Sequence, residues 1–140
     1  MLLFSAMAYG ADVAVLNGNV DLVISSATAG QEPDVDSDQT AQLEWNNWPG
    51  TSATKKITVQ TNLASPNFTL KVQALNITAA TGTSAGEVTL TTISVDLISS
   101  IPAMTSPDVG TCDLRYTATA TASDGINVDT HTITYTIVDE

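Results

Sequence analysis

Apolar and polar residues alternate along the C-terminal stretch 111–140. In its first half the apolar residues fall at every second position, at Cys112, Leu114, Tyr116, Ala118 and Ala120. A polar break containing Asp124-Gly125 follows, and the alternation resumes at His131, Ile133, Tyr135 and Ile137. Alternation with a period of two predicts β-strands, and Asp-Gly is a frequent turn sequence. The pattern predicts a long β-hairpin with one apolar face and one face of threonines.

A second pair of alternating runs occupies the middle of the chain. Ile57 and Val59 alternate with polar residues in 55–61, and a turn sequence containing Pro66 separates this run from Phe68, Leu70, Val72 and Ala74. These two runs predict another hairpin. Upstream, Ala41, Leu43 and Trp45 alternate in the same way, and the turn sequence 46–50 ends that strand.

The N-terminal part contains two shorter apolar sets. One is Val13 and Val15, the other Val20, Leu22 and Ile24, with Asn17-Gly18 between them. An Asn-Gly pair permits a tight turn, a bulge or a change of phase. The segment is therefore either two short strands or one long strand broken in the middle.

Farther along, the apolar positions change parity. They are even at Val88 and Leu90, and odd at Ile93, Val95 and Leu97. A slip of one residue turns side chains to the other face of a strand, so the sequence predicts a bulge or bend at 91–92.

Together these runs predict seven to nine strands, with breaks roughly every eight to twelve residues and no helical period. The expected fold is an all-β, antiparallel β-sandwich with immunoglobulin-like or jelly-roll connections. A closed barrel is the main alternative. The length of 140 residues suits a single domain, which we place at 11–140.

Composition narrows the possible functions. The chain has 22 Thr and 12 Ser, and its four basic residues stand against 15 acidic ones, for a net charge of -11. Nucleic-acid binding needs clustered Lys and Arg, so we expect neither nucleic acid nor an anionic membrane as partner. No apolar run is long enough to span a membrane. Such a charge favours solubility at high concentration and suits an extracellular, salty or divalent-rich medium.

The first ten residues, MLLFSAMAYG, resemble the end of a secretory signal peptide. An apolar run, Leu2 to Phe4, precedes the small-residue pattern Ala6-Met7-Ala8, although the usual basic region is missing. We expect 1–10 to be a signal-peptide remnant and the mature chain to begin near Ala11. The other interpretation is an ordinary first strand or tail.

Catalytic motifs are not evident. His131 is the only histidine and Cys112 the only cysteine, and no nucleophile elbow, phosphate-binding loop or zinc motif occurs. Both residues fall on the apolar side of their runs, so we expect structural roles for them. The chain is not expected to be an enzyme.

The densest charge cluster offers a candidate metal site. Asp34, Asp36 and Asp38 alternate in the polar stretch 27–38, and alternate carboxylates in a loop can face one Ca²⁺ ion. The EF-hand pattern fails at Gln39 and Trp45, so other ligands would have to complete the shell, such as Asp124, Asn127 and Asp129. The alternative is a solvated acidic loop. No other cofactor is expected.

Two further features concern carbohydrate. Trp45 fits the inward register, whereas Trp48 precedes Pro49 in a turn and is a candidate for an exposed ring that stacks on sugar. Asn67 and Asn76 each begin an Asn-x-Thr glycosylation sequence.

A small-residue cleavage site, a strand-like mature start at 11–15 and a threonine-rich sandwich ending in Tyr135-Thr136-Ile137 resemble secreted pilin-like or fimbrial subunits. The lone Cys112 departs from the disulfide-bonded pattern of chaperone–usher subunits. The resemblance implies a subunit of an extracellular filament, pilus or surface layer. It further implies assembly by strand exchange, in which one subunit's terminal strand completes its neighbour's sheet. The inserted side chains would be Val13, Val15, Val20 and Leu22. The alternative function is a secreted adhesion or binding module, either calcium-dependent or directed to carbohydrate.

Overall fold

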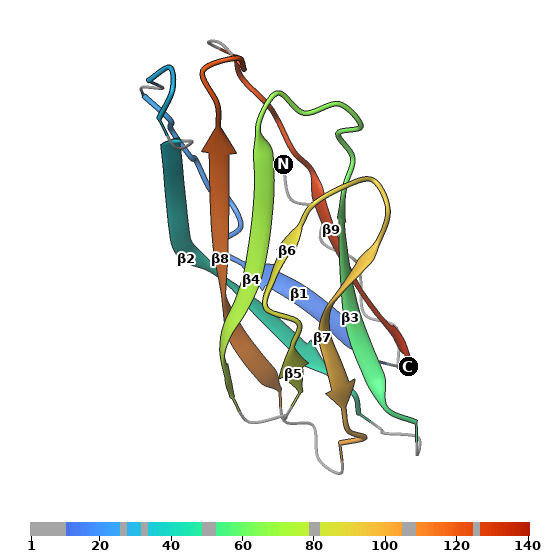
Figure 1. The fold of residues 1–140 in the computed structure, drawn as a ribbon. Helices are drawn as coiled ribbons and strands as arrows, with labels where there is room; N and C mark the ends of the chain where they lie inside the picture. Colours follow the sequence, from blue (N-terminus) through green and yellow to red (C-terminus); the bar gives the residue numbers. More distant parts are fainter. Residues whose placement is uncertain are drawn as a thin grey trace.

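The computed structural model describes residues 11–25, 28–31, 34–48, 53–78, 82–104, 109–124 and 127–140. The expected signal remnant at 1–10 lies outside these ranges. Nine strands and no helix occur in the described residues, in two sheets whose paired strands are all antiparallel (Figure 1). The prediction of an antiparallel β-sandwich with seven to nine strands is confirmed.

The larger sheet has five strands in the order β1-β2-β8-β4-β6. They are β1 (Asp12–Leu16), β2 (Asp34–Asn46), β8 (Gly110–Ala120), β4 (Thr69–Thr78) and β6 (Glu87–Thr89). The smaller sheet has four strands in the order β5-β7-β3-β9. They are β5 (Thr83–Ser84), β7 (Val95–Ile101), β3 (Lys55–Thr61) and β9 (Ile133–Asp139).

From β3 onward, each strand lies in the opposite sheet from the strand before it. Both predicted hairpins are therefore wrong. β8 pairs with β2 and β4, whereas β9 pairs with β3 in the other sheet. β3 and β4 are separated in the same way. Alternation shows that a strand has one apolar face. Two such strands can be neighbours in one sheet or lie in opposite sheets, and the sequence pattern is identical in both cases.

The change of apolar parity near residue 91 has the same origin. The N–H of Leu90 donates to the carbonyl of Leu70 in β4, and the N–H of Thr61 in β3 donates to the carbonyl of Thr91, each at 2.9 Å. The chain thus passes from one sheet to the other here. The predicted bulge or bend at 91–92 is this crossover, where the chain bends at Thr92 and Ile93. Ile93, expected to face inward, is 76% exposed.

The core lies between the two sheets and is formed by their alternate residues. Its largest fully buried side chains include Trp45, Leu43 and Leu114 from one sheet and Ile57 and Leu97 from the other. Trp45 is buried as the sequence predicted. Its indole packs against Gly110, where a methyl group would lie 2.6 Å from Nε1, so the strands approach closely at this point.

The N-terminal arm, which we define as residues 11–25, has one ladder and one extended stretch. β1 pairs with the lower half of β2, from Gln42 to Asn46. Asn17 then takes a positive φ of 53°, and 18–25 forms no strand. Val20, Leu22 and Ile24 are nevertheless half-buried and pack against the core. The second apolar set therefore contributes to packing without joining a sheet.

Candidate functional site

The three aspartates of the candidate metal site lie in β2, not in a loop as expected. Asp34, Asp36 and Asp38 pair with Ala120, Ala118 and Tyr116 of β8. Residues opposite one another in an antiparallel pair share a face, so these carboxylates lie on the inward side of the upper end of β2. A bulge between Asp38 and Ala41 keeps the inward face continuous with the apolar residues below.

The partners of these carboxylates are protein groups. Asp36 Oδ2 accepts the N–H of Val23 at 2.7 Å, which ties the N-terminal arm to β2. Asp38 Oδ1 accepts from the hydroxyl and the N–H of Thr40, and these hydrogen bonds hold the pKa of Asp38 below its usual value. Asp34 Oδ2 is buried without a hydrogen-bond partner among the described residues.

The aspartates do not converge on one point. Alternate residues of a strand are about 6.5–7 Å apart, so a single ion cannot reach all three carboxylates of a straight strand. Among the described residues, no group of three His, Cys, Asp or Glu side chains is placed to hold a metal ion.

The residues proposed to complete a calcium shell are engaged elsewhere. Asp129 accepts from Asn67 Nδ2 at 2.6 Å and from the N–H of Phe68 at 3.0 Å. Burial alone would raise the pKa of Asp129, but these hydrogen bonds lower it overall. Asn127 Nδ2 donates to the carbonyl of Asp124. Asp129, which lies between β8 and β9 in the sequence, therefore contacts the residues just before β4. One of its donors, Asn67 Nδ2, is the nitrogen to which a glycan would attach.

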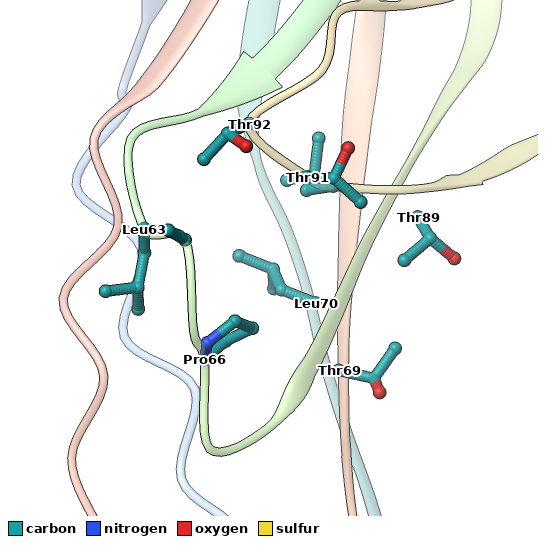
Figure 2. A pocket seen from close by; sticks show the side chains of 9 residues that line it. Leu63, Pro66, Thr69, Leu70, Thr89, Thr91 and Thr92 are labelled. Carbon is teal, nitrogen blue, oxygen red and sulfur yellow. The ribbon is translucent and has the colours of Figure 1, made fainter.

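A shallow pocket of about 160 Å³ lies near the start of β4. It is lined by the 63–66 loop, the first residues of β4 and the crossover after β6. Figure 2 shows Leu63 and Pro66 on one side and Thr69 and Thr89 on the other. Pockets for small molecules are typically about 300–1,000 Å³ and contain convergent polar groups. This pocket is smaller, and its polar side chains are threonine hydroxyls only.

The aromatic and titratable candidates are mostly structural. Trp48 is 38% exposed and Trp45 is 1% exposed, so they do not form a joint stacking surface. Burial raises the pKa of the Cys112 thiol to about 12, which leaves it protonated and unreactive at neutral pH. His131 Nδ1 lies 2.9 Å from Thr61 Oγ1, and burial lowers the pKa of His131 despite the nearby Asp129.

Two polar clusters were not foreseen from the sequence. Inside the sandwich, the Tyr116 and Tyr135 hydroxyls lie 2.6 Å apart and join the two sheets. On the outer face, Asp113 accepts from Asn76 Nδ2 at 2.7 Å, Gln42 Nε2 at 3.2 Å and Gln39 Nε2 at 3.4 Å. These bonds lower the pKa of Asp113. Each cluster joins residues distant in sequence, so the alternation could indicate their faces but not their partners.

The remaining candidate for a functional segment is the N-terminal arm, which is expected from the sequence to exchange between subunits. Val13, Val15, Val20 and Leu22 are all half-buried against the core of their own chain. β1 is the edge strand of the five-stranded sheet, with β2 as its only ladder partner in the described residues. The arm thus has the features of an exchangeable strand: a terminal position, apolar side chains and attachment along one edge.

The chain matches no protein-family model, no curated protein and no solved structure. In the described residues there is also no helix with the length and apolar character needed to cross a bilayer.

Proposed function

We propose that the protein is an extracellular structural subunit that assembles into a filament, pilus or surface layer by non-covalent strand exchange. The observation that supports this most is the N-terminal arm, which inserts apolar side chains into the sandwich while being held by a single ladder. If the arm of one subunit replaces that of the next, the same hydrogen bonds and apolar contacts form between chains. Head-to-tail exchange produces filaments when the rotation between successive subunits does not close a ring.

The position of Asn17 favours such an exchange. Its φ of 53° lies in the left-handed region, and Gly18 follows, so the chain changes direction between β1 and 18–25. A change of backbone angles at these two residues is enough to direct β1 away from its own β2. The half-buried side chains of Val13 and Val15 then need a new partner, because exposing apolar surface to water is unfavourable, by about 1.5–3 kcal/mol for a fully buried side chain and by less for these two.

The extracellular location is proposed from composition. The chain has a net charge of -11, few basic residues and a threonine-rich surface. The inward residues of the sandwich contain one buried thiol and no redox pair. The proposed role involves no catalysis and no cofactor.

A disulfide lock provides the test. Ala14 and Glu44 are directly opposite in the β1–β2 ladder, and opposite Cα atoms of antiparallel strands lie at a distance that a disulfide can span. The chain from Ala11 carrying Ala14→Cys and Glu44→Cys should form no polymers when oxidised and form polymers when reduced. Light scattering and negative-stain microscopy give the readout.

Each single-cysteine variant serves as a control, since neither can form the lock. The unmodified chain from Ala11 should polymerise in both redox conditions. Polymerisation of the oxidised double variant to the same extent would rule out exchange of β1. A monomer at high concentration in all variants would reject assembly altogether.

A further inference from the structure

The four border strands of the two sheets differ in how well they are protected against pairing with another chain. β5 has two residues, β6 has three and begins at Glu87, and β1 has five and begins at Asp12. β9 has seven residues, ITYTIVD, with its one charge at the end. Natural edge strands are usually short, or carry inward charges, lysines, prolines or bulges that prevent further pairing. β9 has none of these devices from Ile133 to Val138.

The backbone of β9 also directs N–H and C=O groups toward the outer edge of its sheet. The carbonyl of Thr132 accepts the N–H of Asn62, and the N–H of Glu140 donates to the carbonyl of Thr54, so even-numbered residues bond on the β3 side. Backbone groups alternate between the two sides of a strand. Those of Ile133, Tyr135 and Ile137 therefore point away from β3, where no strand pairs with β9 in the described part of the chain.

The side chains of β9 suit a neighbouring strand as well. Thr134 and Thr136 are exposed on the outer face, whereas Ile133, Tyr135 and Ile137 are half-buried on the inner face. β-Branched and aromatic residues are favourable in cross-strand pairs. β1 comes near β9 but forms no ladder with it, and β9 is the last strand of the four-stranded sheet, next to β3 (Figure 1).

We propose that β9 pairs antiparallel with β9 of a second copy of this chain, about a two-fold axis at Tyr135. In this register Ile133 lies opposite Ile137 of the second copy, and Thr134 lies opposite Thr136. Tyr135 faces its own counterpart and exchanges both backbone hydrogen bonds with it. No two like charges are opposite one another in Ile133–Val138. The two four-stranded sheets become one continuous sheet, and the interface is isologous, so it closes as a dimer.

This interface goes beyond the proposed strand exchange, because it uses the other sheet and does not involve the N-terminal arm. Each copy carries a net charge of -11, which opposes association at low salt. At about 0.5 M NaCl, charges farther apart than a few ångströms are largely screened. The dimer should therefore form more strongly as the salt concentration rises, unlike a contact made by ion pairs.

The test uses the full chain and the variant Thr134→Lys/Thr136→Lys. In the proposed register each new lysine lies opposite a lysine of the second copy, and like charges opposite one another oppose pairing. All proteins in this test also carry the oxidised Ala14→Cys/Glu44→Cys lock, so that exchange of β1 forms no polymers. Sedimentation equilibrium at about 0.5 M NaCl should then show a dimer for the chain without added lysines and at least a tenfold weaker association for the double-lysine variant. The control is Gln60→Lys, which adds a charge to the same outer face but on β3, away from the border.

Amide hydrogen exchange by NMR identifies the register. Raising the protein concentration should slow exchange at Ile133, Tyr135 and Ile137 in the unmodified chain and in Gln60→Lys, but not in the double-lysine variant. Monomeric behaviour at the highest soluble concentration, or protection confined to another strand, would overturn the proposal. Deleting 11–16 removes β1 exchange alone, so loss of polymers with retention of the β9 dimer separates the two interfaces.

Discussion

At the scale of single residues, the close contact between Gly110 and Trp45 fixes one end of the sandwich. Gly110 is the first residue of β8 and pairs directly with Trp45 of β2. The Trp45 Nε1 group is buried without a hydrogen-bond partner among the described residues. The indole therefore contributes through packing, and that packing depends on the absence of a Cβ at position 110.

Gly110→Ala should destabilise the fold by about 1–3 kcal/mol, because the added methyl overlaps the rigid indole ring of Trp45, which cannot bend away as the end of a flexible side chain could. Urea unfolding followed by tryptophan fluorescence measures the change. Thr117→Ala, on the outer face of the same strand, is the matched control and should change stability little. Equal stability of Gly110→Ala and the unmodified chain would show that the indole can move.

His131 gives the fold a dependence on pH near neutrality. Its pKa in the folded state is lowered by burial from the ordinary 6.5, so the folded protein takes up the proton less readily than the unfolded chain. Stability is then fully present above about pH 6.5 and falls as the pH drops toward the folded pKa. Asp38, Asp113 and Asp129, whose pKa values are lowered, remain ionised throughout this window.

The unmodified chain should therefore melt at a lower temperature at about pH 5.5 than at about pH 7.5, and His131→Gln should show a smaller difference. Glutamine retains a polar group near Thr61 without a titrating ring. Differential scanning calorimetry at matched ionic strength provides the comparison. If both proteins show the same pH dependence, another group is responsible.

At the scale of the elements, the two sheets are joined by a polar contact within an apolar core. Tyr116 comes from β8 and Tyr135 from β9, and burial raises the pKa of Tyr116 to about 12 and raises the pKa of Tyr135 well above its ordinary value. Both hydroxyls stay protonated at any physiological pH. One hydroxyl donates to the other, so the contact offsets part of the cost of burying both, which a single buried hydroxyl without a partner would bear in full.

Tyr135→Phe should cost about 1–3 kcal/mol, because it leaves the Tyr116 hydroxyl buried without this partner. Tyr116→Phe should have a similar effect. The double variant should be more stable than the sum of the single changes predicts, since it removes both hydroxyls together. Additive single effects in chemical unfolding would indicate that each hydroxyl has another partner, such as water.

At the scale of the whole molecule, electrostatics is dominated by repulsion. The Lys55–Asp139, Lys56–Asp96 and Lys71–Glu87 pairs account for all three lysines. Arg115 donates to Gln73. These cations lie on β3, β4 and β8, whereas the charged residues of β1 and β2 are all acidic. The acidic side of the sandwich is thus the side of the N-terminal arm.

Raising NaCl from about 0.05 to about 0.5 M should increase the melting temperature at neutral pH, because screening weakens repulsion among the carboxylates more than it weakens the few exposed ion pairs. The increase should shrink near the sequence pI of about 4.1, where the net charge is close to zero. Thermal melts at several salt concentrations and dilute protein exclude effects of association. A melting temperature that falls with salt at pH 7 would contradict the argument.

The sequence by itself determined the class of fold and much of the core. Period-two alternation showed which residues face inward, and Leu43, Trp45, Ile57, Val59 and Leu114 are all fully buried. The prediction that Val20, Leu22 and Ile24 also lie in a strand is wrong, because 18–25 forms no ladder, although these side chains still pack against the core. These features follow from local geometry, because successive side chains of an extended chain point to opposite sides.

Only the tertiary structure decided which strands are neighbours. Two successive strands with apolar faces can pair in one sheet or lie in opposite sheets. Both arrangements bury the same residues in the core, so the pattern cannot distinguish a hairpin from a crossover. For the same reason the sequence did not predict that Asp34, Asp36 and Asp38 lie in a strand paired with β8, nor did it predict the Tyr116–Tyr135 contact or the open border of β9. Each depends on pairings between residues far apart in the chain, which are set by the packing of the whole sandwich.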